Sequence, residues 1–260
     1  MRNLMLLFSV VFLTSCEADD VPKTDSSIME TDIEFYAREV YLDPEPSEPV
    51  LTLDFRTTKI YNCYNYYIDF DYSSEDQELK VMFKSIGMRE ICLTALGPAK
   101  GWLKIPEDTK RLTLVRGETT DVYEVDINDQ RVKLHPVDTN FTKLVHERTY
   151  RAPEDSFAVV CGTNLQETGL CDEFNNLILE IPTVTEFEFE GVGLRPYPDS
   201  SSGNWNNTAT RFFLYQEDAA FIQAGEVLKD FAAEKIEPDK GNTIAIISWD
   251  GRKFYSWLKD

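Results

Sequence analysis

Carboxylates are the most abundant side chains in this chain that could take part in catalysis. Aspartate and glutamate together account for 46 of the 260 residues. Two carboxyl groups that face each other at roughly 5–9.5 Å can hydrolyse a glycosidic bond, one as the acid and the other as the base or nucleophile. The two partners need not be close in sequence, so no particular pair is singled out. A hydrolase that acts on glycans through paired carboxylates is therefore one hypothesis for the function.

Few other side chains could form a catalytic group. The two histidines, His135 and His146, lie in no recognisable motif, and a serine or cysteine nucleophile needs a base beside it. The common motifs of serine hydrolases, zinc proteases, nucleotide-phosphate loops and dinucleotide-binding folds are also missing from the sequence. We therefore name no catalytic residue, no metal ligand and no cofactor, and we prefer a non-catalytic binding or structural role.

Aromatic residues are the better candidates for ligand contact. Tyr64 and Tyr67 belong to the cluster YNCYNYY, and Trp205 lies in a stretch rich in Gly, Asn and Ser. An exposed ring flanked by Asn and Asp suits stacking on a sugar ring or a protein contact. The other interpretation places the tyrosines in a β-sheet core and Trp205 in loop packing.

The first residues, MRNLMLLFSVVFLTSC, combine a positive start with an apolar run from Leu4 to Leu13 and a cysteine. The run is shorter than the roughly 20 residues needed to cross a bilayer, and it suits a signal peptide. Its end, Leu13-Thr14-Ser15-Cys16, resembles the lipobox of bacterial lipoproteins. The resemblance implies that residues 1–15 are removed and that Cys16 carries a diacylglycerol on its thiol and an acyl chain on its amino group. An ordinary signal peptide or an uncleaved signal anchor is the other interpretation.

The residues after Cys16 are acidic and polar. Glu17-Ala18-Asp19-Asp20 resembles the export signal on surface lipoproteins of Bacteroidota-type bacteria, whereas the other interpretation is a solvated acidic linker. We therefore expect residues 16–31 to form a flexible tether at the outer membrane, on the periplasmic or the surface face. The expected partner is an envelope protein or a glycan, and the sequence leaves the oligomeric state open.

The charge of the chain excludes one class of partner. A formal net charge of −20 argues strongly against nucleic-acid binding, which requires a basic face. It also argues against electrostatic docking on anionic lipid, so the lipid on Cys16 is the expected membrane contact.

The remaining four cysteines, Cys63, Cys92, Cys161 and Cys171, are an even number, which in an exported protein suggests disulfides. We favour the pairs Cys63–Cys92 and Cys161–Cys171, because each pair then falls inside one predicted domain. Free buried thiols are the other interpretation.

Residues 32–145 have the pattern of short antiparallel strands. Apolar and polar side chains alternate from Tyr66 to Tyr72, from Leu79 to Phe83 and from Tyr123 to Ile127, and turn-rich stretches separate these runs. About seven such strands at this spacing predict an antiparallel, immunoglobulin-like β-sandwich.

After a charged linker at 146–155, residues 156–260 show a different rhythm. Apolar residues recur at helical spacing in two stretches, from Leu170 to Ile181 and from Phe221 to Ala232, and strand patterns surround both. The resulting order, β-α-β-β-α-β with one extra strand, is that of a ferredoxin-like split βαβ unit. The whole chain is thus predicted to be mainly β, with an α+β C-terminal domain.

Overall fold

The computed structural model describes residues 29–43, 45–163, 169–197, 201–202, 205–237 and 240–258, without the side chains of 201–202 and 205–207. Two sheets, of ten and seven strands, hold most of these residues, and two helices accompany the second sheet. The prediction of a mainly β chain with two helices in its C-terminal part is confirmed. No described helix is long and apolar enough to cross a membrane. The predicted signal peptide and the lipidated Cys16 lie outside the described residues.

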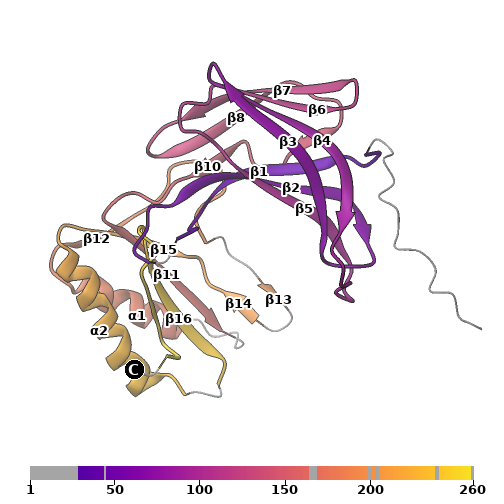
Figure 1. The fold of residues 1–260 in the computed structure, drawn as a ribbon. Coiled ribbons are helices and arrows are strands. Elements are labelled where there is room, and N and C mark those ends of the chain that lie inside the picture. Colours follow the sequence, from indigo (N-terminus) through magenta and orange to yellow (C-terminus); the bar gives the residue numbers. More distant parts are fainter. Residues whose placement is uncertain are drawn as a thin grey trace, which may run out of the picture.

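The first sheet is a single curled sheet with the order β10-β8-β7-β6-β4-β3-β5-β2-β1-β9 (Figure 1). Its strands are β1 (Ile33–Val40), β2 (Val50–Tyr61), β3 (Tyr66–Glu75), β4 (Glu78–Met88), β5 (Gly97–Lys104), β6 (Arg111–Arg116), β7 (Thr119–Ile127), β8 (Arg131–Asp138), β9 (Thr142–Leu144) and β10 (Arg148–Tyr150). Most neighbours are antiparallel, but β4 pairs in parallel with β6, β3 with β5 and β1 with β9.

The alternation read from the sequence marks the inner face of this sheet. Leu79, Val81 and Phe83 of β4 are buried, as are Tyr123 and Val125 of β7. They belong to one apolar core that the curled sheet encloses. The two ends of the sheet approach each other, because the buried hydroxyl of Thr149 in β10 donates a hydrogen bond to the carbonyl of Ala37 in β1, at 2.7 Å.

The second sheet is antiparallel and has both helices on one face. Its elements are β11 (Ser156–Thr163), α1 (Gly169–Leu179), β12 (Val184–Phe187), β13 (Ser201–Ser202), β14 (Trp205–Asn207), β15 (Arg211–Tyr215), α2 (Asp218–Lys235), β16 (Asn242–Ser248) and β17 (Lys253–Tyr255). Strand β11 lies between β15 and β16, β12 lies outside β15, and β17 lies outside β16. Phe174 of α1 and Phe221 and Leu228 of α2 are buried against this sheet in a second core.

Two disulfides have the sequential pairing expected from the sequence. Cys63–Cys92 joins the loop after β2 to the loop after β4. Cys161–Cys171 joins β11 to α1. Each bridge therefore stays within one sheet and its own connections.

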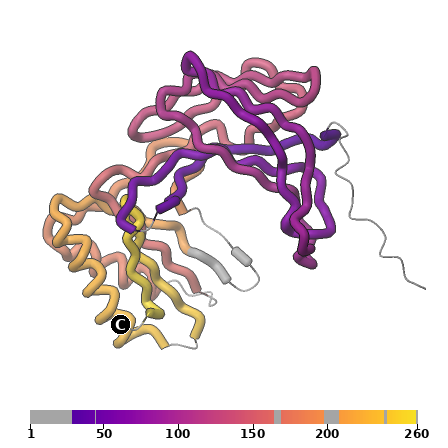
Figure 2. The backbone as a smooth tube through the Cα atoms, viewed as in Figure 1, coloured from indigo at the N-terminus to yellow at the C-terminus, as the bar shows by residue number. Residues whose placement is uncertain are grey.

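The two sheets contact each other through polar bonds between distant segments. The hydroxyl of Tyr41 donates to the carbonyl of Trp249 at 2.7 Å, and the amide of Ser47 donates to the carbonyl of Asp250 at 2.8 Å. On another side, the segment after β12 adds to β10, because the amide of Tyr150 donates to the carbonyl of Leu194 at 2.8 Å. The tube in Figure 2 shows these segments meeting between the two sheets.

Candidate functional site

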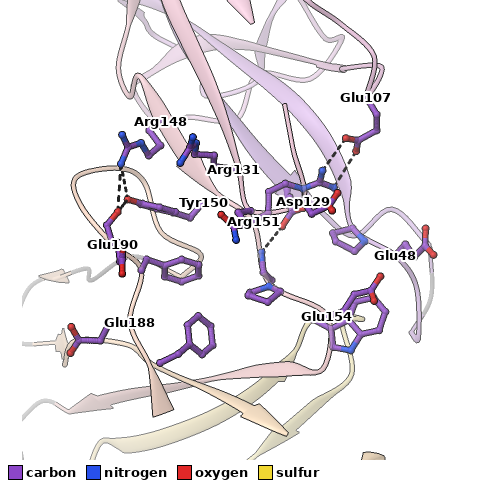
Figure 3. Close-up of a pocket in the computed structure, with 18 residues that line it drawn as sticks. Glu48, Glu107, Asp129, Arg131, Arg148, Tyr150, Arg151, Glu154, Glu188 and Glu190 are labelled. Atoms are coloured by element: carbon purple, nitrogen blue, oxygen red, sulfur yellow. Dashed lines mark hydrogen bonds and ion pairs between the residues drawn. The ribbon is translucent and has the colours of Figure 1, made fainter. Parts of the chain in front are cut away.

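A cavity of about 930 Å³ lies where the two sheets meet (Figure 3). Its walls come from the β1–β2 connection, the β7–β8 turn, β10 and the residues after it, the end of β12 and the end of β16. The lining residues with charged or aromatic side chains are Glu39, Glu48, Glu107, Asp129, Arg131, Arg148, Tyr150, Arg151, Glu154, Phe187, Glu188, Phe189, Glu190 and Trp249.

Arg151 joins two carboxylates at one side of the cavity. Its Nε donates to Oε1 of Glu39 at 2.8 Å, and its two terminal nitrogens donate to both oxygens of Glu107 at 2.9 and 3.1 Å. The amide of Ala152 donates to the other oxygen of Glu39 at 3.0 Å. Burial raises the pKa of Glu39 above its ordinary value, against the opposing effects of Arg151 and the Ala152 amide. Both oxygens of Glu39 are therefore engaged, and this carboxyl group fixes β1 to the segment after β10.

Arg131, Arg148 and Tyr150 form another wall, on the outer face of β8 and β10. Tyr150 lies directly opposite Arg131 in the strand register, and Arg148 lies two residues away on the same face. Neither arginine makes an ion pair with a carboxylate of the described residues. The Nε atoms of both are buried without a hydrogen-bond partner in the described part of the chain. The Nη1 atom of Arg148 donates to the hydroxyl of Tyr150 at 3.1 Å. Because neither guanidinium group has a carboxylate partner in the described part of the chain, their terminal N–H groups can donate to oxygen atoms of a ligand.

Aromatic rings continue from Tyr150 across to the second sheet. The ring centre of Tyr150 lies 4.9 Å from that of Phe189, which in turn lies 5.3 Å from Phe187. Trp249 lines a separate part of the cavity, and its indole nitrogen donates to the hydroxyl of Tyr215 at 3.2 Å. The cavity thus offers ring faces and edges next to its charged groups.

Five further carboxylates line the cavity without an ion pair among the described residues: Glu48, Asp129, Glu154, Glu188 and Glu190. All five residues are exposed. Carboxylate oxygens accept hydrogen bonds from hydroxyl groups, so this acidic rim is suited to a ligand rich in hydroxyls.

Two glycines allow the segment after β12 to approach β10 closely. Gly191 has a φ of +88°, a conformation that favours glycine. A Cβ atom on Gly193 would lie 2.8 Å from the ring of Tyr150 and 3.0 Å from the carbonyl oxygen of Arg148. The cavity wall made by Phe187 and Phe189 depends on this close approach.

Replacing Gly193 with alanine should therefore lower the free energy of unfolding by about 1–3 kcal/mol, because the backbone of Arg148 cannot move aside as a flexible side chain could. Chemical denaturation measures this loss. Gly169→Ala is the matched control, since nothing lies within 4 Å of its added Cβ, and alanine in a helix should leave stability equal or slightly higher. Equal stability of the Gly193→Ala variant and the wild type would show that the segment is not held against β10.

The aromatic residues predicted to contact a ligand lie away from this cavity. Tyr64 and Tyr67 are partly exposed, on the outer face near the ends of β2–β5. The ring of Tyr64 covers Gly97, and the ring of Tyr67 covers Gly87, its cross-strand partner. Lys100 donates to the hydroxyl of Tyr64 at 2.6 Å. The side chain of Trp205 lies outside the described part of the structure.

Cys161 and His146 are engaged elsewhere, and His135 lies exposed on β8. The thiol of Cys161 is consumed in a disulfide. His146 packs edge-on against Tyr36 with ring centres 5.8 Å apart, and burial lowers its pKa. Among the described residues, no group of three His, Cys, Asp or Glu side chains is arranged to hold a metal ion.

Comparisons with known proteins found no family model, no curated protein and no solved structure that matches this chain. The function is therefore inferred from the cavity itself. No motif marks the cavity residues in the sequence, although Arg148 and Tyr150 flank Thr149 in a short run that forms a strand.

Proposed function

We propose that this protein is a lipid-anchored protein of the bacterial cell envelope that binds a glycan without catalysis, in the cavity between its two sheets. The observation that carries the proposal is one cavity that combines aromatic rings, two arginines without a carboxylate partner and an acidic rim. The anchor is proposed from the lipobox that ends at Cys16. The outer membrane is its proposed location, with the folded part at the surface or in the periplasm.

The chemistry of a sugar fits this set of groups. Aromatic side chains present an apolar ring next to polar groups, which suits the apolar C–H face of a sugar. Carboxylates such as Glu188 and Glu190 accept hydrogen bonds from hydroxyls, and Arg131 and Arg148 donate to sugar oxygens. The cavity volume of about 930 Å³ falls within the range of roughly 300–1,000 Å³ that small-molecule sites occupy.

The two carboxylates that Arg151 binds, Glu39 and Glu107, support binding over hydrolysis. Glu39 has a raised pKa, as an acid catalyst would need, but Arg151 and the Ala152 amide occupy both its oxygens. Glu107 is held by the same arginine. The glycan-acting hydrolase remains the second candidate because Glu188, Glu190 and Asp129 line the same cavity, and the test below separates the two.

We also propose the finer fold assignments made from the sequence. The strand order β12-β15-β11-β16, with both helices on one face, supports a ferredoxin-like split βαβ unit for residues 156–260. For residues 32–145 the immunoglobulin-like sandwich is the proposal, supported by the apolar core that the curled sheet encloses. The single sheet and its three parallel strand pairs depart from the two antiparallel sheets of that fold.

The test is calorimetric titration of a chain that starts at Glu17 with a panel of neutral and uronic-acid oligosaccharides. We expect one class to bind, and we expect the double variant Arg131→Ala/Arg148→Ala to raise its Kd about 10- to 100-fold, because two hydrogen bonds from charged donors are lost. The panel also shows whether the arginines select a sugar that carries a carboxylate.

Arg89→Ala/Arg111→Ala is the matched control, because both of these arginines are exposed and lie outside the cavity, and its Kd should equal that of the wild type. The proposal would be contradicted if Kd rose equally in both double variants, or if no sugar of the panel bound. If the protein released shorter sugars from any oligosaccharide of the panel, the glycan-acting hydrolase would become the proposed function.

A further inference from the structure

An exposed apolar tip lies at the end of the first sheet where β2 and β4 end and β3 and β5 begin. We define the apolar tip as six residues: Ile60, Tyr64, Tyr67, Ile91, Leu93 and Leu96. Ile91 is 75% exposed and Leu96 is 76% exposed. Single exposed apolar residues are ordinary, but a group of six in two neighbouring loops and the adjoining ends of β2 and β3 marks a surface that contacts something. This end of β2–β5 lies at the lower right of the first sheet in Figure 2.

The tip is held in one conformation rather than being a loose loop. The Cys63–Cys92 disulfide joins its two loops, and the amide of Tyr64 donates to the carbonyl of Leu93 at 3.0 Å. The side chain of Asn65 donates to the carbonyl of Ile91 and accepts from the amide of Leu93. Backbone groups of Tyr64, Ile91 and Leu93 are therefore hydrogen-bonded inside the tip, while the side chains of Ile91 and Leu93 stay exposed. That combination is required of any segment that enters an apolar medium.

The charge around the tip is opposite in sign to that of the whole chain. Lys59, Arg89 and Lys100 surround it, and Glu90 is the acidic residue within its loops. The chain as a whole has a net charge of −20. Basic residues at the edge of an apolar patch favour contact with the headgroups of anionic lipids.

The N-terminal segment meets the sheet at the same end. The amide of Thr58 donates to the carbonyl of Asp32 at 2.9 Å, and the amide of Lys59 donates to the hydroxyl of Thr31 at 3.2 Å. Lys59 directly precedes the first residue of the tip. Residues 17–28 lie between Cys16 and Met29, and this stretch spans at most about 45 Å when extended. A lipid on Cys16 would therefore keep the tip within reach of the membrane surface.

We propose that the apolar tip inserts into the interfacial region of the membrane to which Cys16 anchors the chain. The proposal rests on the proposed lipid anchor, and it makes the tip a second, peptide-borne membrane contact. Aliphatic side chains inserted beside basic residues are the usual composition of such contacts. The tip orients the folded part, because Glu39 and Glu48 of the cavity lie near the opposite end of β1 and β2 from the tip. The cavity is then held away from the bilayer, where a glycan can enter it.

The test is flotation of the chain that starts at Glu17, which carries no lipid, with vesicles of phosphatidylethanolamine and phosphatidylglycerol at about 3:1. The wild type should float with the vesicles, and Ile91→Ser/Leu96→Ser should lower the partition coefficient about tenfold or more, because two apolar side chains no longer leave water. Val137→Ser/Val192→Ser is the matched control, since Val192 is 93% exposed and Val137 is exposed on β8, and it should float like the wild type.

Three outcomes would overturn the proposal. The wild type could fail to float, or the Ile91→Ser/Leu96→Ser variant could float equally well. The third outcome is that sedimentation shows a concentration-dependent dimer and that the Ile91→Ser/Leu96→Ser variant no longer dimerises. The tip would then bind a second copy of this chain. The intact mass of the native protein reports the lipid on Cys16 independently, so failure of the tip and failure of the anchor are distinguishable.

Discussion

Replacing Arg151 with methionine should lower the free energy of unfolding by about 3–5 kcal/mol at pH 7. The side chain of Arg151 is 16% exposed and that of Glu39 is 10% exposed. Removal of the guanidinium leaves the carboxylate of Glu39 in a buried position with only the Ala152 amide as a partner, and an uncompensated buried charge carries a cost of this size. Urea denaturation at constant temperature measures the difference.

The loss of stability in the Arg151→Met variant should depend on pH in a direction that follows from the pKa of Glu39. Burial raises the pKa of Glu39 in the folded wild type, so the contribution of this group to stability is fully present below its unfolded value and is lost as the pH rises through its folded value. Without Arg151 the charged form loses its main partner, so the pKa of Glu39 rises further. The deficit of the variant should therefore be largest at neutral pH and should shrink as the pH falls towards about 4.5, the ordinary pKa of Glu39.

Arg111→Met is the matched control for this experiment. Arg111 forms an exposed ion pair with Glu78, at 3.5 Å, and exposed pairs contribute roughly 0–1 kcal/mol. A second variant, Glu39→Leu/Arg151→Met, removes both charges and should recover much of the lost stability. If Arg151→Met and the wild type unfolded at the same urea concentration at pH 7, Glu39 would not depend on Arg151.

Local patterns in the sequence predicted the local structure well. The alternation from Leu79 to Phe83 corresponds to β4, and the helical spacings correspond to α1 and α2, because one buried face imposes its period on each element. The pairing Cys63–Cys92 was predicted from the simple expectation that each bridge stays within one domain.

The pairing of distant strands could not be predicted in the same way. The parallel partners β4 and β6 are separated by β5, and β1 meets β9 more than a hundred residues later. No local periodicity encodes which strands become neighbours. The continuous curled sheet of ten strands therefore could not be predicted from the sequence and is known only from the structure.

The cavity could not be predicted from the sequence for the same reason. Glu39, Arg151 and Trp249 come from segments that meet only in the folded chain. The segment HERTYRAPED was interpreted as a charged linker, yet Arg148–Tyr150 forms β10 and lines the cavity. Its short alternation around Thr149 was the signal available, but three residues are too few to distinguish a strand from a linker.

Replacing Asp121 with alanine should lower the free energy of unfolding by about 3–5 kcal/mol, through loss of the bonds that close the first sheet. Asp121 is fully buried in β7. Its carboxylate accepts hydrogen bonds from the backbone amides of Asn140, Phe141 and Thr142 at 2.7, 3.1 and 2.7 Å. Alanine would leave the buried amides of Phe141 and Thr142 without an acceptor, and each buried donor left unsatisfied costs roughly 1–3 kcal/mol.

The position of β9 explains why this one side chain has so large an effect. Thr142 is the first residue of β9 and pairs with Ile33 of β1, and the amide of Ile33 donates to the carbonyl of Phe141 at 3.1 Å. Without Asp121 the loop at 139–141 loses its fixed path, so the amide of Ile33 should also lose protection in hydrogen exchange. Asp126→Ala, an exposed position on the same strand, is the matched control and should change stability by no more than about 0.5 kcal/mol.

Asp121→Asn separates the shape of this side chain from its capacity to accept hydrogen bonds. Asparagine has the same size but only one accepting oxygen, and its NH₂ group would face amides that need an acceptor. The stability of the Asp121→Asn variant should therefore lie between those of the wild type and Asp121→Ala, and the amide of Ile33 should lose part of its protection in hydrogen exchange. If Asp121→Ala destabilised the protein no more than Asp126→Ala does, the edge of the sheet would be held by the β1–β9 pairing itself and not by the buried carboxylate.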